Sequence, residues 1–449
     1  MKRLHRPVAA AAVLLAATAI AAEDKPMERI FPYDTHVETL DNGLRVILVP
    51  MSSEGLVAYW TIVRTGSRDE YEPGRTGFAH FFEHMMFQGT ETVDQETYNA
   101  TVTRMGADAN AFTSDDLTAY HLGITAGDLE QTMKLESDRF QNLSYSEQDF
   151  ETEAGAVYGE YRKNRMNPFF TIWEAVHEAA FDKHTYGHTT MGYEKDIKEM
   201  PRMFDYSRSF FSRYYRPDNV VLLVVGDVEI PATMALVRKY YGAWNAGYKA
   251  PTVPDEPPQT VERRIDVEYK GKTLPIVWLA YKAGRFDPAD EMYVATGLLA
   301  ELAFGETSDV YKKLVLDEQA VELIAADLGH SRDPGLFNVY ARVKEPGRVD
   351  EVLAEIDGVI ERYRETPPDA GRLADLKSRL KYGFLMGLDT PDGVASGLAR
   401  LVAITGGIEA VDELYRTYDR ITPEGVQAAA RAYLVPTGRT VAKLKGADR

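Results

Sequence analysis

The second half of the chain repeats the pattern of the first half, and this repeat constrains the fold more than any other feature. The apolar run 277–284 resembles the run 60–66, and both runs end in glycine. Each run leads into a helical pattern that ends at a further glycine, Gly89 in the first half and Gly305 in the second. Repeated patterns of this kind predict two tandem halves that share one fold.

A second pair of similar segments lies near the C-terminal ends of the two halves. Residues 215–226 combine a tyrosine, a proline and an apolar strand-like run, and residues 433–442 repeat this combination. Between the halves, residues 246–262 are rich in proline and glycine, which is typical of a linker. The chain of 449 residues is also too long for one ordinary domain. We therefore predict an N-terminal domain at 30–245 and a C-terminal domain at 263–449.

The local patterns mix strands, a hairpin and amphipathic helices without regular strand–helix alternation. The segments that we expect are a hairpin at 37–50, strands at 56–64, 118–124 and 220–225, and helices at 97–105, 129–143, 146–164 and 231–241. Residues 169–215 read as helical with loops. This mixture favours an α+β fold, in which each half is a largely antiparallel sheet packed by helices.

Composition excludes some classes of protein. The formal net charge is −18, and no long block of lysine or arginine occurs, so nucleic acid is not an expected partner. The hydrophobic and charged fractions, 45% and 27%, are those of a soluble globular protein. Cysteine is absent, which excludes disulfides and thiolate metal ligands.

Residues 1–22 have the pattern of a secretory signal. An apolar run at 8–20 ends in an Ala-x-Ala pattern, so cleavage is expected after Ala21 or Ala22. The positive charges that precede this run are Lys2, Arg3 and Arg6. The run is too short for a stable membrane helix, although an uncleaved anchor is the alternative. We expect a periplasmic or secreted protein without a stable membrane span.

The segment 77–87 contains a His-x-x-Glu-His motif. On a helix, His80 and His84 lie on one face, about 6 Å apart along the axis and roughly 40° apart around it. Two imidazole nitrogens so placed can converge on one metal ion. Glu83 can reach the same side, where a carboxylate can take a proton from metal-activated water. A polar helix edge without a metal is the alternative, but the order of the motif is that of the inverzincins.

A hydrolytic metal site needs a third protein ligand besides the two histidines. The other histidines of the mature chain are His36, His121, His177, His184, His188 and His330. Of these, His184 and His188 are four residues apart, but the residues between them read as a turn in a structural loop. The helix 146–164 also offers the acids Glu147, Glu151, Glu153 and Glu160. Glu153 and Glu160 share one helix face, which could equally be a solvated acidic face.

The motif residues His80, Glu83 and His84, followed by Glu160 in the segment 153–162, resemble the pitrilysin, insulysin and mitochondrial-processing-peptidase family of zinc proteases. Further similar stretches are 41–46, 66–70, 110–114 and 214–226. The resemblance implies that His80, His84 and Glu160 hold Zn²⁺ and that Glu83 is the general base. It also implies that Glu153 supports the site by orienting a ligand or water.

The resemblance further implies a site for an extended peptide substrate. The residues that would pair with the peptide through their main chain are Asn110, Ala111, Phe112 and Thr113. Such pairing adds the peptide as a strand to the edge of a sheet. An ordinary edge strand without a binding role is the alternative reading of the same segment.

One departure from the family pattern concerns the metal-free half. Many members carry an arginine and a tyrosine there, in a stretch that resembles 314–322. In this chain the matching positions hold Val315 and Glu322, unless the alignment has slipped. We therefore expect a heterodimer with a related metal-free subunit that carries the Arg/Tyr pair, and a homodimer is also possible.

Together these patterns predict a zinc-dependent endopeptidase that hydrolyses peptides or small proteins bound in extended form, as the catalytic subunit of a heterodimer. The competing hypothesis is a non-catalytic binding or assembly subunit with a structural or vestigial zinc site. An intact base at Glu83 favours the enzyme, because a structural zinc site needs no base.

Overall fold

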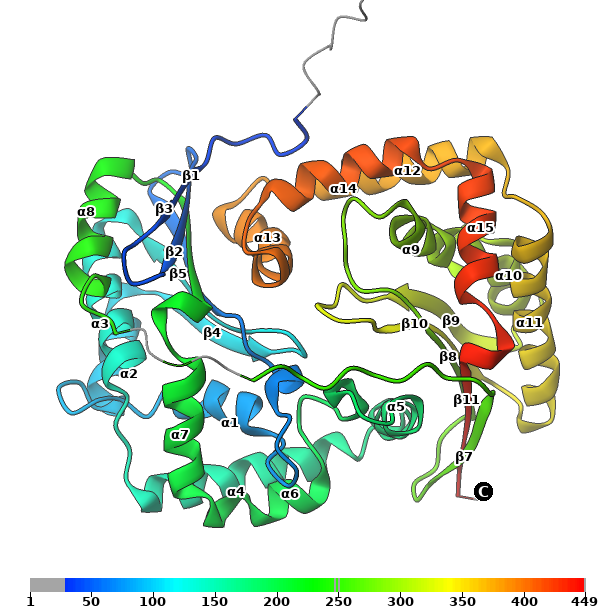
Figure 1. Ribbon diagram of the computed structural model, residues 1–449, viewed down its shortest axis with the longest axis horizontal. Coiled ribbons are helices and arrows are strands. Elements are labelled where there is room, and N and C mark those ends of the chain that lie inside the picture. The colour runs from blue at the N-terminus through cyan, green and yellow to red at the C-terminus, as the bar shows by residue number, and fades with distance from the viewer. Residues whose placement is uncertain (1–28, 246–247, 249–250, 448–449) are drawn as a thin grey trace, which may run out of the picture.

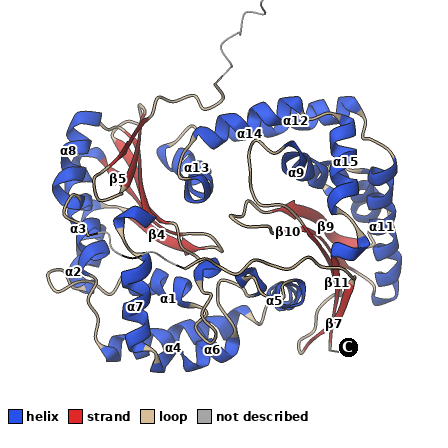
Figure 2. Ribbon diagram, viewed as in Figure 1, coloured by secondary structure: helices blue, strands red, loops and turns tan. Residues whose placement is uncertain are grey.

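The computed structural model describes residues 29–245, 248 and 251–447, and it contains two β-sheets, each packed by helices (Figures 1 and 2). The first sheet has the strand order β1-β2-β6-β3-β5-β4, and the second has the order β7-β11-β8-β10-β9. The predicted α+β fold with two similar, mostly antiparallel sheets is confirmed. The predicted signal sequence at 1–22 lies outside the described residues.

The elements of the first half extend from β1 to α8. Its strands are β1 His36–Thr39, β2 Arg45–Pro50, β3 Leu56–Val63, β4 Asp108–Thr113, β5 Thr118–Thr125 and β6 Val220–Gly226. Its helices are α1 Phe78–Met85, α2 Gln95–Met105, α3 Leu129–Asn142, α4 Glu147–Asn164, α5 Pro168–Ala180, α6 Glu194–Glu199, α7 Phe204–Tyr214 and α8 Ile230–Tyr241.

The elements of the second half extend from β7 to β11. Its strands are β7 Arg263–Tyr269, β8 Ile276–Lys282, β9 Val321–Leu328, β10 Leu336–Val343 and β11 Arg439–Gly446. Its helices are α9 Glu291–Phe304, α10 Asp309–Tyr311, α11 Val349–Glu365, α12 Ala370–Met386, α13 Pro391–Thr405, α14 Glu409–Arg420 and α15 Pro423–Tyr433.

The second sheet repeats the strand pairing of the first. In the first sheet β6 runs parallel to β2 and antiparallel to β3, which continues through β5 to the edge strand β4. In the second sheet β11 runs parallel to β7 and antiparallel to β8, which continues through β10 to the edge strand β9. Both β6 and β11 follow a short 3₁₀ turn that begins with proline, as the similarity of 215–226 and 433–442 predicts.

The first sheet is buried on both faces, which explains the unbroken apolar run of β6. Alternate residues of β6 belong to two different cores. Val220, Leu222 and Val224 pack with α1 and the other helices of the first half, whereas Val221, Leu223 and Val225 face the second half. A strand covered on both faces has no reason to alternate apolar and polar residues.

One helix of each half packs on the sheet of the other half. Helix α13 packs on β3 and β6 of the first sheet, and helix α5 packs on β7, β8 and β11 of the second (Figure 1). Both helices begin with proline after a capping residue, Asn167 for α5 and Thr390 for α13, and both follow a long helix. The exchange makes the two halves mutually dependent, because each sheet would otherwise expose an apolar face to water.

The predicted elements agree with the structure except at their ends. The helix of the His-x-x-Glu-His motif was expected to continue to Gly89, but α1 ends at Met85 and a turn follows. The predicted linker 246–262 is partly outside the described residues, and its described residues, 248 and 251–262, form no helix or strand. The domain boundary there stays a prediction.

Among the described residues, no single helix is long and apolar enough to span a membrane, and only the bent pair α13 and α14 meets those criteria jointly.

We expect Leu398→Ala in α13 to destabilise both halves together. Leu398 is fully buried in the core that joins the first sheet to the second half, so its truncation should cost about 2–5 kcal/mol of unfolding free energy. Calorimetry should show one cooperative transition at a lower melting temperature. Ser396→Ala, on the exposed side of the same helix, is the matched control and should change stability by less than about 0.5 kcal/mol. Two separate transitions, of which only one moves, would contradict the mutual dependence.

Candidate metal centre

Helix α1 holds the motif between an apolar side and a polar side. Its apolar side chains Phe78, Phe81, Phe82 and Met85 are fully buried in the first core. At its start, Gly77 adopts the left-handed conformation with φ of 91°, where a side chain would be strained. The buried carboxylate of Glu70 accepts hydrogen bonds from the main-chain N–H groups of Gly77 and Ala79, at 2.6 and 2.7 Å. These contacts fix the helix, and with it the direction in which the polar side faces.

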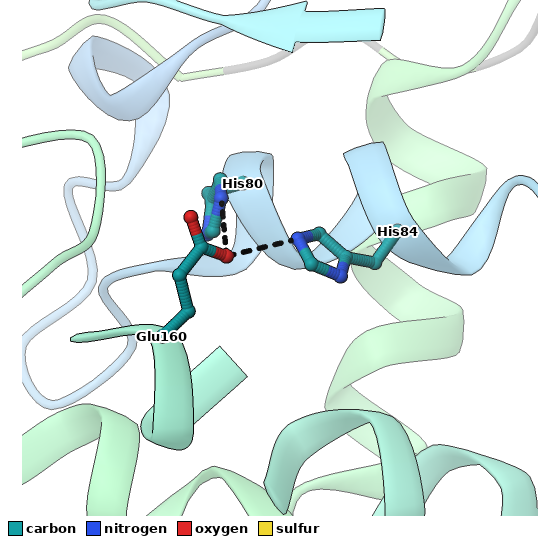
Figure 3. A group of neighbouring side chains, drawn as sticks. All are labelled: His80, His84 and Glu160. Atoms are coloured by element: carbon teal, nitrogen blue, oxygen red, sulfur yellow. Dashed lines mark ion pairs between the residues drawn. The ribbon is translucent and has the colours of Figure 1, made fainter. Parts of the chain in front are cut away.

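The polar side of α1 meets Glu160 of helix α4 (Figure 3). The Oε2 atom of Glu160 lies 3.3 Å from Nε2 of His84 and 3.6 Å from Nε2 of His80. One ligand atom from each of the three residues lies within 4.8 Å of the others. Atoms bound to a tetrahedral zinc ion at about 2.0–2.1 Å lie roughly 3.3–3.4 Å apart. The donor set and its spacing therefore fit a zinc ion without a large movement of the chain.

The imidazole of His80 is in the form that a metal binds. Burial and, to a smaller extent, the neighbouring His84 together lower the pKa of His80 to about 4, against the opposing effect of the Glu160 carboxylate. The ring is therefore neutral at pH 7, with a lone pair available. Its Nδ1 atom is buried and has no hydrogen-bond partner among the described residues.

The imidazole of His84 is oriented by Glu153, which lies seven residues before Glu160 on α4. Nδ1 of His84 lies 2.8 Å from Oε1 of Glu153, which leaves Nε2 facing Glu160. This hydrogen bond is the main cause that raises the pKa of His84 above its ordinary value, although burial opposes it. The amide of Gln88 donates to the other oxygen of Glu153 at 3.0 Å. Glu153 is thus fixed from two sides and holds one ring orientation.

Glu83 lies beside this group and contacts the edge strand of the first sheet. The hydroxyl of Thr113, the last residue of β4, donates to Oε2 of Glu83 at 2.7 Å. Burial raises the pKa of Glu83 above its ordinary value, while the bond from Thr113 and the charge of His84 oppose this rise. Glu83 is therefore a partly buried acid beside the candidate metal ligands.

The structure places the other predicted residues as follows. Asn110, Ala111, Phe112 and Thr113 lie on β4, which is an edge strand, as expected. Glu147 and Glu151 are not part of the metal group in the described chain. The loop with His184 and His188 contains a 3₁₀ turn, and His184 contacts Asp333 of the second half at 2.9 Å, in agreement with a structural role.

Two supporting residues were not predicted as parts of the site, Gln88 and Glu70. Gln88 lies four residues after His84, in the turn that follows α1, so its spacing from His84 was a usable signal. The contact of Glu70 with the start of α1 depends on the intervening loop and had no comparable signal. In the second half, Thr296, Leu299 and Ala300, which are as far before Gly305 as His80, Glu83 and His84 are before Gly89, are buried in the core. No metal group occurs in that half within the part of the chain that the structure describes.

Comparisons with known proteins agree with this geometry. Residues 45–194 match the family described as "Insulinase (Peptidase family M16)", and residues 204–380 match "Peptidase M16 inactive domain". The zinc protease PqqE of Helicobacter pylori is 27% identical over 413 residues, which are 91% of this chain and 92% of that protein. The mitochondrial-processing peptidase subunit beta of Bos taurus is 25% identical over 428 residues, 91% of this chain and 84% of that protein. The crystal structure of a protease from Helicobacter pylori superposes with a TM-score of 0.86 at 25% identity, covering 92% of this chain and 100% of that one.

We expect Glu153→Gln to weaken metal binding at this group without unfolding the protein. Loss of the carboxylate removes the acceptor that orients His84, and such changes typically cost about 10- to 100-fold in metal affinity. Competition with a chromophoric zinc chelator measures the affinity. Glu151→Gln, an exposed acid on the same helix, is the matched control and should leave it unchanged. Equal affinities for both variants would remove Glu153 from the site.

Proposed function

We propose, on the premise that this chain belongs to the insulinase family of peptidases (family M16), that it is a zinc-dependent endopeptidase with Glu83 as its general base. The observation that carries the proposal is the convergence of His80, His84 and Glu160, with the partly buried Glu83 beside them. The family membership supports peptide hydrolysis, and the names of its zinc-protease relatives support zinc as the metal.

The chemistry divides between the metal and the chain. A zinc ion held by His80, His84 and Glu160 supplies polarisation of a carbonyl and a lowered pKa of water when it is bound. Glu83 accepts the proton of the attacking water and later delivers it to the nitrogen of the leaving amine. Glu153 keeps His84 in one orientation throughout. The burial that raises the pKa of Glu83 also makes it a better proton acceptor than an exposed carboxylate.

The substrate is proposed to bind along β4. This strand pairs only with β5 in the described chain, so its other edge has main-chain groups available for an extended peptide. Pairing of this kind gives affinity through main-chain hydrogen bonds and depends little on the peptide sequence. Because β4 ends at Thr113, which contacts Glu83, a peptide aligned on β4 comes close to the base.

A related metal-free subunit is proposed as a partner. The positions of the expected Arg/Tyr pair hold Val315 and Glu322, and Glu322 is exposed on β9, where it pairs with Arg342 at 3.1 Å. These groups cannot stabilise an oxyanion as an arginine and a tyrosine would. The bovine relative is named as a subunit, which agrees with an assembly of chains. A homodimer is the second possibility, and export to the periplasm or the medium, indicated by residues 1–22, belongs to the same proposal.

The alternative function is a non-catalytic binding or assembly subunit with a structural zinc site. The absence of the Arg/Tyr pair favours it, and so does the match of residues 204–380 to a domain described as inactive. The partly buried acid Glu83 speaks against it, because a structural site gains nothing from an acid whose burial costs free energy.

We expect Glu83→Gln to keep the metal and lose turnover. Glutamine has the same size as glutamate but cannot accept a proton, so kcat should fall about 10²- to 10⁴-fold while the zinc content stays unchanged. Metal analysis and hydrolysis of a quenched fluorescent peptide library measure the two quantities. His80→Ala is the companion variant and should lose the zinc itself. Full activity of Glu83→Gln would remove this residue from the mechanism.

We expect hydrolysis to depend on a second chain. The purified protein should cleave the peptide library slowly alone and faster when mixed with a related metal-free chain that carries the Arg/Tyr pair. Size-exclusion chromatography of each chain and of the mixture reports which assembly forms. Full activity of a monomer would exclude the partner, and no activity in any mixture would favour the binding subunit.

A further inference from the structure

We propose that Thr113 is a positioning residue that orients the carboxylate of Glu83, so that one strand aligns both the substrate and the base. This inference rests on the proposed function, because it assigns a role toward Glu83 as a general base. Its direct observation is the hydrogen bond of 2.7 Å between Oγ1 of Thr113 and Oε2 of Glu83. It connects two elements, α1 and β4, that also pack against each other.

The side chain of Thr113 faces α1 rather than the free edge of the sheet. Side chains alternate along a strand, so Thr113 shares its face with Ala109 and Ala111, which pack against the core that contains α1. Asn110 and Phe112 lie on the opposite face, where Phe112 contacts Trp60 with ring centroids 6.1 Å apart. The main chain of Thr113 also bonds to Glu83, so a peptide paired with β4 would meet the main chain of the residues before Thr113, while the Thr113 hydroxyl stays bound to Glu83.

A threonine at this position is suited to hold a carboxylate. Its branched side chain has few accessible rotamers, so its hydroxyl has a fixed direction. Glutamate, by contrast, has several rotatable bonds, and without a partner its carboxylate would sample several positions. A carboxylate accepts about four hydrogen bonds, so the bond from Thr113 leaves capacity for a water molecule. Thr113 therefore selects one orientation of Glu83 without blocking its function as a base.

The test compares Thr113→Val with Thr113→Ser in the chain assembled as it is active, alone or with its partner. Valine has nearly the same shape as threonine but lacks the hydroxyl, so kcat should fall about 10- to 100-fold, the cost of a hydrogen bond to a charged group. KM and zinc content should not change, and Thr113→Ser should recover most of the loss. Thr118→Val is the matched control. Thr118 faces Thr113 across the β4–β5 pair, but its hydroxyl donates to the carbonyl of Thr65. It should leave kcat unchanged.

A double-mutant cycle separates positioning from other roles. If Thr113 acts only through Glu83, adding Thr113→Val to Glu83→Gln should reduce the residual kcat little further. Additive losses, or a rise in KM with unchanged kcat, would overturn the inference and leave Thr113 as a direct substrate contact. Loss of zinc from Thr113→Val would overturn it as well, since the role would then be structural. Full activity of Glu83→Gln would overturn the proposed function itself. An unchanged kcat of Thr113→Val, with Glu83→Gln inactive, would overturn only this inference.

Discussion

The rest of the site depends on the burial of one short helix. Helix α1 has only eight residues, and an isolated helix of that length is not stable in water. It persists because Phe78, Phe81 and Phe82 are buried beneath the first sheet and because Glu70 satisfies two of its first N–H groups. Burial raises the pKa of Glu70 more than those two hydrogen bonds lower it. The polar face of α1 is thus fixed by its apolar face, and the direction of His80 and His84 follows.

The exchange of helices between the halves extends this constraint to the whole chain. Glu160 lies near the end of α4, and α5 follows directly and packs on the second sheet. The third candidate ligand is thereby tied to the second half, although that half contributes no metal-binding residue in the described chain. At the junction, Arg68 contacts Asp333 with a hydrogen bond of 2.6 Å, and Arg64 donates to the carbonyl of Ala403 at the end of α13. The metal-free half therefore helps to position Glu160 through the packing of α5 on the second sheet.

Sequence patterns predicted the elements and the ligands better than the contacts between them. The apolar run of β6 and the Ser146 cap of α4 are local signals, and both are present in the structure. The candidate ligand Glu160 was selected by resemblance to a family, since its helix also reads as a solvated acidic face. The exchange of α5 and α13 could not be predicted, because an apolar helix face does not specify which sheet covers it. The bond between Thr113 and Glu83 joins residues 30 positions apart and depends on how α1 packs against β4, which no local pattern records.

The strongest argument for catalysis is that the partial burial of the Glu83 carboxylate costs free energy of folding. A partly buried carboxylate is costly unless it is paired, and its hydrogen-bond partner here is the neutral hydroxyl of Thr113. Local instability of this kind is expected where chemistry requires it. The second half has the same strand pairing but no metal group within the described chain, so the fold does not by itself require an acid such as Glu83.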